Sequence, residues 1–116
     1  MAGPFVLYGI PNCDTVKKAR TWLDEAALPY RFHDYKKAGI DAATLQAWCN
    51  EFGYEQVLNK KGTTWRQLDD ASQANINQDK AIKLMQQHTS LIKRPMLDTG
   101  ARRLLGFNLG DYQSLL

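Results

Sequence analysis

The residues around position 10 restrict the fold more than any other part of this sequence. An apolar run of strand length, 5–10, is interrupted by a turn at Pro11 and Asn12. Cys13 follows directly, and the apolar residues after it recur at the spacing of an amphipathic helix. The sequence therefore predicts a strand that leads into a cysteine at the first turn of a helix.

A cysteine in this position is favoured as a thiolate. The unpaired amide groups and the positive end of the helix dipole both stabilise negative charge at a helix N-terminus. The carboxylate of Asp14 opposes this effect, and we expect the helix end and nearby basic residues to outweigh it. We interpret Cys13 as a nucleophile; the alternative is a small buried apolar residue at the end of a strand.

The rest of the chain adds a second strand, a helical block, a hairpin and a final helix. Asp41 is expected to cap a helix whose apolar stripe includes Cys49, and Gly53 is expected to end it. In chain order, the predicted elements are a strand at 5–10, a helix at 14–28, a strand at 30–35, helices at 41–52, 54–58 and 79–88, strands at 91–98 and 102–105, and a helix at 109–116.

This order predicts an α/β fold of the thioredoxin-like type. The first two strands form a parallel pair through a right-handed crossover, and the last two form an antiparallel hairpin. The result is a four-stranded mixed sheet covered by helices, with a helical insertion between the second and third strands. We therefore predict one domain over 1–116, with its core at 1–39 and 91–116 and the insertion at 40–90.

Composition is that of an ordinary globular protein. Of the 116 residues, 44% are apolar and 23% charged, and the net charge of +3 gives little support for nucleic-acid binding. No apolar run approaches the roughly 18 residues needed to cross a bilayer, and the first residues do not resemble a secretory signal. The two cysteines have neither disulfide-framework nor metal-ligand spacing. We expect a cytoplasmic protein without a membrane segment, bound metal or bound cofactor.

Three blocks of residues also match a known family, in that family's order and over nearly the whole chain. The blocks are Tyr8-Gly9-Ile10-Pro11-Asn12-Cys13 with Lys17-Lys18-Ala19-Arg20-x-Trp22-Leu23, then Leu58-Asn59-Lys60-Lys61-Gly62-Thr63-Thr64, then Leu91-Ile92-Lys93-Arg94-Pro95. They resemble the arsenate reductases of the glutathione- and glutaredoxin-dependent type, the ArsC family, with their relatives the Spx regulators. The sequence is most similar to the YffB-like branch, for which a glutathione-dependent thiol reductase role has been proposed.

The resemblance implies a role for several residues. It makes Cys13 the nucleophile and Arg94 the residue that binds an oxyanion or stabilises the thiolate, and it implies a cis bond between Arg94 and Pro95. Arginine suits this task because it stays charged and offers planar, paired donors. The implied partners are glutathione as cosubstrate, a small oxyanion or thiol substrate, and glutaredoxin. The remaining predicted binding residues are Asn12, Asn59, Lys60, Lys61, Pro95, Arg102 and Arg103.

Two departures from the family pattern narrow the expected chemistry. Val16 stands where redox-sensing relatives have a second cysteine, so Cys13 is expected to form a mixed disulfide or an arsenic adduct that an external thiol resolves. Asn59 stands where arsenate reductases have an arginine, so the sequence supports arsenate as the substrate less strongly than it supports glutathione as the cosubstrate. The sequence therefore predicts a glutathione-dependent monothiol reductase. The alternative is an Spx-like transcription regulator that binds RNA polymerase without catalytic turnover.

Overall fold

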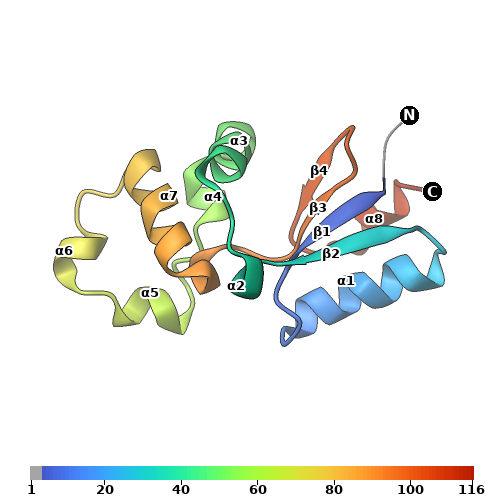
Figure 1. The fold of residues 1–116 in the computed structure, drawn as a ribbon, viewed down its shortest axis with the longest axis horizontal. Helices are drawn as coiled ribbons and strands as arrows, with labels where there is room; N and C mark the ends of the chain where they lie inside the picture. Colours follow the sequence, from blue (N-terminus) through green and yellow to red (C-terminus); the bar gives the residue numbers. More distant parts are fainter. Residues whose placement is uncertain (1–3) are drawn as a thin grey trace. The chain divides into compact units, whose positions relative to one another are not determined.

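The computed structural model describes residues 4–116, and the chain divides into two compact units. The first unit contains the chain up to Ala38 together with Arg94–Leu116, and the second contains Gly39–Lys93. The helical segment between the second and third strands therefore occupies 39–93, compared with the 40–90 expected from the sequence. Figure 1 shows the strands and the helices of both units.

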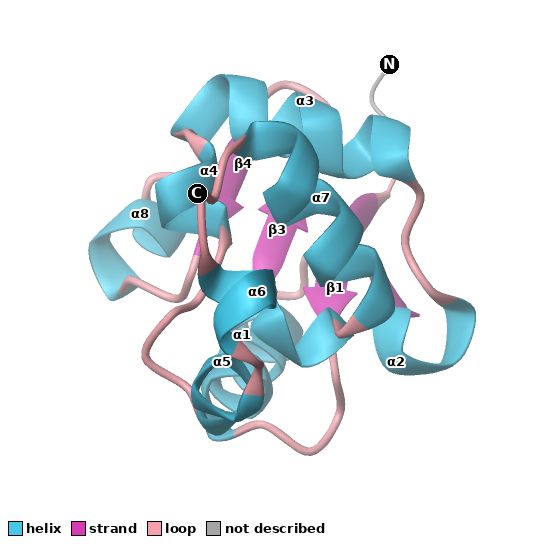
Figure 2. Ribbon diagram, turned by 90° about the vertical axis from the view of Figure 1, so that its left-hand side faces the viewer, coloured by secondary structure: helices cyan, strands magenta, loops and turns pink. Residues whose placement is uncertain are grey.

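The first unit contains a four-stranded mixed sheet with the strand order β2-β1-β3-β4. Strand β1 is parallel to β2 and antiparallel to β3, and β3 and β4 form an antiparallel hairpin; Figure 2 shows β1, β3 and β4 within the sheet. This is the predicted thioredoxin-like topology. Its elements are β1 (Phe5–Gly9), α1 (Asp14–Glu25), β2 (Tyr30–Asp34), α2 (Tyr35–Ala38), β3 (Met96–Asp98), β4 (Arg103–Leu105) and α8 (Leu109–Gln113).

A row of apolar side chains crosses this sheet and forms the core of the first unit. The strand register aligns Phe32, Leu7, Leu97 and Leu104 on neighbouring strands, so all four lie on one face. Helices α1 and α8 pack against this face, and each fully buried large side chain contributes about 1.5–3 kcal/mol. The buried residues that the two helices add to this core are Ala19, Leu23 and Tyr112.

Gly9, at the end of β1, allows α1 to lie close to the sheet. A Cβ atom at this position would be 2.8 Å from Cγ2 of Val16, which is closer than two carbon atoms normally approach. Val16 is fully buried in the first turns of α1, so it has little room to move. The missing side chain at Gly9 therefore helps to set the position of the turn that carries Cys13.

The second unit is helical, as predicted. Two of its longer helices begin at side-chain caps: Oδ1 of Asp41 accepts a hydrogen bond from the Thr44 amide at 2.7 Å at the start of α3, and Asn77 caps α7 in the same way. Helix α3 packs against α4 and α7, and no helix within residues 4–116 is long and apolar enough to span a bilayer. The elements are α3 (Ala42–Phe52), α4 (Tyr54–Val57), α5 (Thr63–Gln67), α6 (Asp70–Gln73), α7 (Gln78–Gln87) and the 3₁₀ helix η1 (Thr89–Leu91).

The predicted strand at 91–98 is wrong in its first half. Only Met96–Asp98 pairs within the sheet, whereas Ile92 forms an isolated antiparallel bridge with Leu58 in the second unit. Pro95 lies between the two pairings and has no backbone N–H to donate, so a single ladder cannot continue through it. The two halves of the predicted strand therefore serve different units.

Two smaller differences concern short helices. The predicted second strand ends one residue early, because Oδ1 of Asp34 accepts a hydrogen bond from the Lys36 amide at 3.0 Å and Tyr35 begins α2. Helix α6 was not predicted; Asp69 caps it by accepting a hydrogen bond from the Ser72 amide at 2.7 Å. Both helices span a single turn, and so short a segment has too few residues to show a helical period.

Candidate active site

Three chain segments meet at one end of the sheet in the first unit. Strands β1 and β2 are parallel and Gly9 pairs with Asp34, so the chain leaves both strands at the same edge. Strand β3 is antiparallel to β1, so the residues before β3 approach this edge as well. Cys13 follows β1, Tyr35 follows β2, and Arg94 precedes β3. These three residues form the candidate active site.

Cys13 is the N-cap residue of α1 and is partly exposed. Its carbonyl oxygen accepts the first helical hydrogen bond, from the Lys17 amide at 2.9 Å. Burial acts to raise the pKa of the thiol, but the Val16 amide, a hydrogen bond from Arg94 and the Thr15 amide together outweigh burial and lower it. The lowered pKa gives Cys13 a larger thiolate fraction near neutral pH than a free cysteine has.

Arg94 lies between Cys13 and the residue that follows β2. Its side chain forms hydrogen bonds with both the Cys13 thiol and the Tyr35 phenol. A guanidinium stays charged and carries five N–H donors in one plane, so it can hold a thiolate and the oxygen atoms of an anionic ligand. The bond between Arg94 and the buried Pro95 is cis, which confirms the prediction from the sequence.

The predicted binding residues of the second unit lie between α4 and α5. The backbone N–H of Asn59 donates a hydrogen bond to the carbonyl oxygen of Leu91 at 2.7 Å. The side-chain oxygen Oδ1 of Asn59 accepts a hydrogen bond from the backbone N–H of Lys61 at 3.0 Å. Nζ of Lys60 lies 5.3 Å from the ring centroid of Trp65. Lys60 and Lys61 are exposed. This loop presents two positive charges to solvent, and the amide oxygen of Asn59 supports the loop's own backbone.

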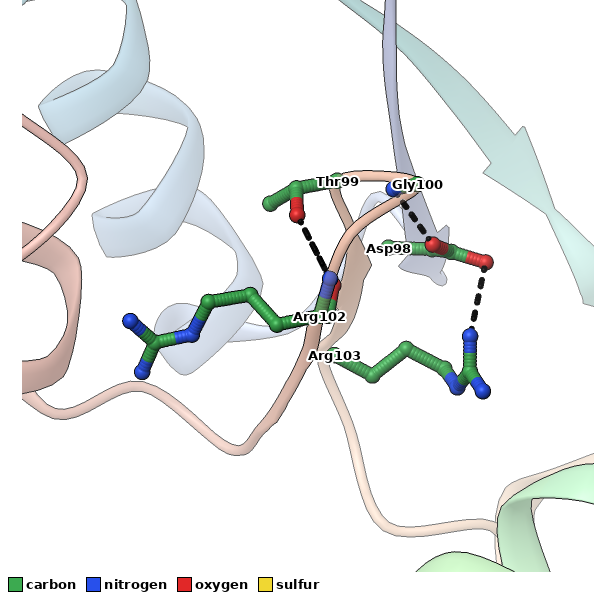
Figure 3. Close-up of polar contacts among 5 residues, drawn as sticks. All are labelled: Asp98, Thr99, Gly100, Arg102 and Arg103. Atoms are coloured by element: carbon green, nitrogen blue, oxygen red, sulfur yellow. Dashed lines mark hydrogen bonds and ion pairs between the residues drawn. The ribbon is translucent and has the colours of Figure 1, made fainter. Parts of the chain in front are cut away.

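Arg102 and Arg103 lie on the hairpin, and Figure 3 shows their guanidinium groups pointing in different directions. Arg102 donates to Oγ of Ser114 at 3.0 Å, and Arg103 lies 3.8 Å from a carboxylate oxygen of Asp98. Arg103 pairs with Asp98, which pairs with Val6 near the start of β1, whereas Cys13 follows the end of β1. The structure therefore places both arginines at the other end of the sheet from Cys13.

Cys49 lies in a different environment from Cys13. It is 2% exposed in α3, as expected for a core residue. Burial raises the pKa of its thiol, and the carboxylate of Glu55 raises it further. Within residues 4–116, neither cysteine belongs to a group of three or more side chains that could bind a metal ion. Cys49 is therefore a buried thiol with little thiolate character.

A model of one protein family, the ArsC family, matches residues 8–115 and so covers Cys13 and Arg94. The chain belongs to the ArsC family. Among its relatives with solved structures, the YffB protein is 54% identical, with a TM-score of 0.92 over 95% of this chain and 96% of that one. An arsenate reductase (ArsC)-related protein from Brucella melitensis is 40% identical, with a TM-score of 0.75 over 98% and 95%. The global transcriptional regulator Spx of Enterococcus faecalis is 26% identical over 95% of this chain and 84% of its own length.

These likenesses agree with the thioredoxin-like topology of the ArsC chain and with the family resemblance found in its sequence. Of the predicted site residues, Asn12 lies in the exposed turn just before Cys13. Tyr35 was missed, because the sequence indicated only a strand residue there. The signal that could have found it is topological: in a parallel pair, the residue after the second strand emerges beside the residues after the first.

Proposed function

We propose that this ArsC family protein is a glutathione-dependent monothiol reductase with Cys13 as its nucleophile. The observation that carries the proposal is the placement of Cys13 at a helix N-terminus beside Arg94, which lowers the pKa of the thiol. A thiolate is the reactive form in thiol chemistry. The similarity to an arsenate reductase-related protein supports the wider class of reductase.

The proposed reaction reduces a mixed disulfide between a substrate thiol and glutathione. The Cys13 thiolate attacks the glutathione sulfur, a new S–S bond forms, and the old S–S bond breaks. Its electron pair leaves with the substrate thiolate, which takes a proton from solvent. The thiolate of a second glutathione then attacks the glutathione sulfur held on Cys13, which restores the Cys13 thiolate and releases oxidised glutathione. One disulfide is reduced and one is formed, so the electrons balance.

The resolving thiol comes from outside the chain in this proposal. Position 16, one helical turn after Cys13, is a fully buried valine packed against Gly9. The second cysteine, Cys49, is 2% exposed and its thiol has a raised pKa. Cys13 therefore acts as a single catalytic thiol, and free glutathione supplies the second sulfur.

The proposal also assigns the anionic groups of the substrate. Arg94 holds an anionic group next to the reacting sulfur. Lys60 and Lys61 are exposed in the second unit, and their part in binding stays a prediction from the sequence. Arg102 and Arg103 are left out because of their place on the hairpin. Asn59 is neutral where arsenate reductases have an arginine, so a disulfide rather than arsenate is the proposed electrophile.

Intact mass after incubation with oxidised glutathione tests the proposal. The wild type and Cys49→Ser are expected to gain one glutathionyl group, which added glutathione removes. Cys13→Ser is expected to gain none, because its hydroxyl does not exchange with a disulfide. An adduct on Cys49 with Cys13 unmodified would contradict the assignment of the nucleophile.

The similarity to Spx supports a second candidate, a regulator that binds RNA polymerase. The buried Val16 leaves no thiol at that position for a disulfide switch with Cys13, but it does not affect a permanent contact with a partner. Affinity capture with purified RNA polymerase distinguishes the two functions. Stoichiometric binding in the absence of any thiol exchange by Cys13 would favour the regulator.

A further inference from the structure

We infer that Tyr35 is a positioning residue for Arg94: its buried phenol anchors the guanidinium beside Cys13 while leaving the positive charge of Arg94 intact. The inference deepens the proposed function, and it rests on the role of Cys13 as the nucleophile. It assigns a task to a residue that lies outside the three sequence blocks of the family resemblance.

The backbone places Tyr35 firmly at the candidate site. Tyr35 is the first residue of α2 and is fully buried, with 0% of its surface exposed. Helix α2 begins there because Oδ1 of Asp34 binds the amides of Lys36 and Lys37 at 3.0 Å and 3.4 Å. Helix α2 contacts both β1 and β2. The phenol ring is therefore held at the same sheet edge as Cys13, and it has little freedom to change rotamer.

The direction of the hydrogen bond between Tyr35 and Arg94 follows from chemistry. A guanidinium has donors and no acceptor, so the phenol oxygen accepts a hydrogen bond from Arg94. Arg94 also donates to the Cys13 sulfur. Because the guanidinium is planar, fixing one of its N–H groups on a rigid acceptor limits how the others can rotate. The contact with Tyr35 thus orients Arg94 toward the thiolate.

A tyrosine suits this task better than a carboxylate. A carboxylate would hold the guanidinium more strongly, but its negative charge would offset the charge that stabilises the thiolate. Burial raises the pKa of Tyr35 despite the opposing effect of Arg94, so the phenol stays neutral. The other charges that act on the phenol belong to Cys13 and Asp34, and both favour its neutral form. The neutral phenol therefore does not offset the positive charge by which Arg94 stabilises the Cys13 thiolate.

The chain offers a matched control on the strand that precedes Tyr35, β2. Nε of Arg20 donates to the phenol oxygen of Tyr30 at 3.1 Å, which is also a hydrogen bond from an arginine to a tyrosine. Tyr30 begins β2 and pairs with Phe5, so it lies at the end of the sheet away from Cys13. Tyr30→Phe removes the same kind of contact without touching the candidate site.

The test is the rate of Cys13 alkylation by iodoacetamide as a function of pH, with the modified cysteine identified by mass. Iodoacetamide is neutral and needs no glutathione, so the result does not depend on the substrate. In Tyr35→Phe, we expect the apparent pKa of Cys13 to rise by about half a unit, which means roughly threefold less thiolate at pH 7. Arg94→Ala should raise it further, and the double variant should match Arg94→Ala, because Tyr35 acts through Arg94. Tyr30→Phe should match the wild type.

Three results would overturn the inference. The first is a Tyr35→Phe profile that superimposes on that of the wild type. The second is an equal shift when Tyr35→Phe is made in Arg94→Ala, since Tyr35 would then act independently. The third is an equal shift in Tyr30→Phe. Urea unfolding of each variant checks that the fold is retained, and Arg94→Lys gives a second measure, because a lysine should respond less to Tyr35→Phe. If Cys13 exchanges with glutathione but Tyr35→Phe has no effect, the proposed function stands and this inference falls.

Discussion

Cys13 and Cys49 carry the same thiol in two regions that shift its pKa in opposite directions. Cys13 precedes the first turn of α1, where free amide groups face its sulfur. Cys49 lies in the last turn of α3, where its carbonyl oxygen accepts a hydrogen bond from the Gly53 amide at 2.8 Å. The positive end of one helix therefore favours the first thiolate, and the negative end of the other disfavours the second. The pKa is lowered at Cys13 and raised at Cys49.

The comparison shows that position along a helix decides what a cysteine can do. Both thiols lose hydration through burial, which acts to raise both pKa values. At Cys13 the amides and the charge of Arg94 compensate for this loss, whereas at Cys49 the nearby charge of Glu55 adds to it. The buried Cys49 thiol is therefore suited to packing, whereas the start of a helix beside an arginine gives Cys13 the environment expected of a nucleophile.

The largest effect expected from this comparison is a difference in native-state alkylation. At pH 7, iodoacetamide should modify Cys13 at least about 100-fold faster than Cys49, because Cys49 reacts only after local opening of its unit. Mass analysis of the two cysteine peptides over time measures the ratio. In guanidinium chloride the two rates should become similar. Comparable alkylation rates of the two cysteines in the folded protein would contradict the difference between their environments.

Gly9→Ala is expected to have a smaller effect on the alkylation rate of Cys13. The new Cβ would contact Cγ2 of Val16 at 2.8 Å, so the first turn of α1 must shift and Cys13 with it. We expect a loss of about 1–3 kcal/mol in the free energy of unfolding and a severalfold drop in the alkylation rate of Cys13, with Cys49 unchanged. Urea unfolding and alkylation measure the two quantities.

Val16→Ala supplies the control for that prediction. Combined with Gly9→Ala, it removes the two methyl groups of Val16 that the new Cβ would meet. The double variant should therefore recover much of the Cys13 alkylation rate lost in Gly9→Ala. A rate that stays low would show that Gly9 acts on Cys13 by another route.

The smallest expected effect is an opposite dependence of stability on pH. The pKa of Cys13 is lowered by folding, so its contribution to stability grows as the pH rises through the folded pKa toward about 9. The pKa of Cys49 is raised by folding, so stability is lost once the pH exceeds the unfolded value and approaches the folded one. Urea midpoints at pH 7 and pH 9.5 measure the change.

Each cysteine variant should remove one of these two contributions to the pH dependence of stability. Relative to the wild type, Cys13→Ser should gain less or lose more stability on going to pH 9.5, and Cys49→Ser should lose less. Groups other than the cysteines titrate alike in all three proteins, so their effects cancel in the differences. Changes of the same sign in both variants would contradict the opposite pKa shifts.

The sequence by itself determined the elements that local interactions control. The turn before Cys13 and the stripe that buries Cys49 depend on residues a few positions apart, and both were predicted correctly. The Asp41 cap likewise needs only the Thr44 amide three residues on. The family motif also indicated the cis bond before Pro95. Local patterns and the family motif together were therefore enough to single out the candidate nucleophile and its arginine.

Only the tertiary structure decided what depends on strand register. Residues far apart in the chain are placed together by pairing, and a difference of a few residues in register moves a side chain from one end of the sheet to the other. Register placed Arg103 beside Asp98, away from the candidate nucleophile Cys13. It also put the start of α2 beside the end of β1, where Tyr35 meets Arg94. Local sequence patterns do not encode these distances, because they are set by which strands pair and where each pairing starts.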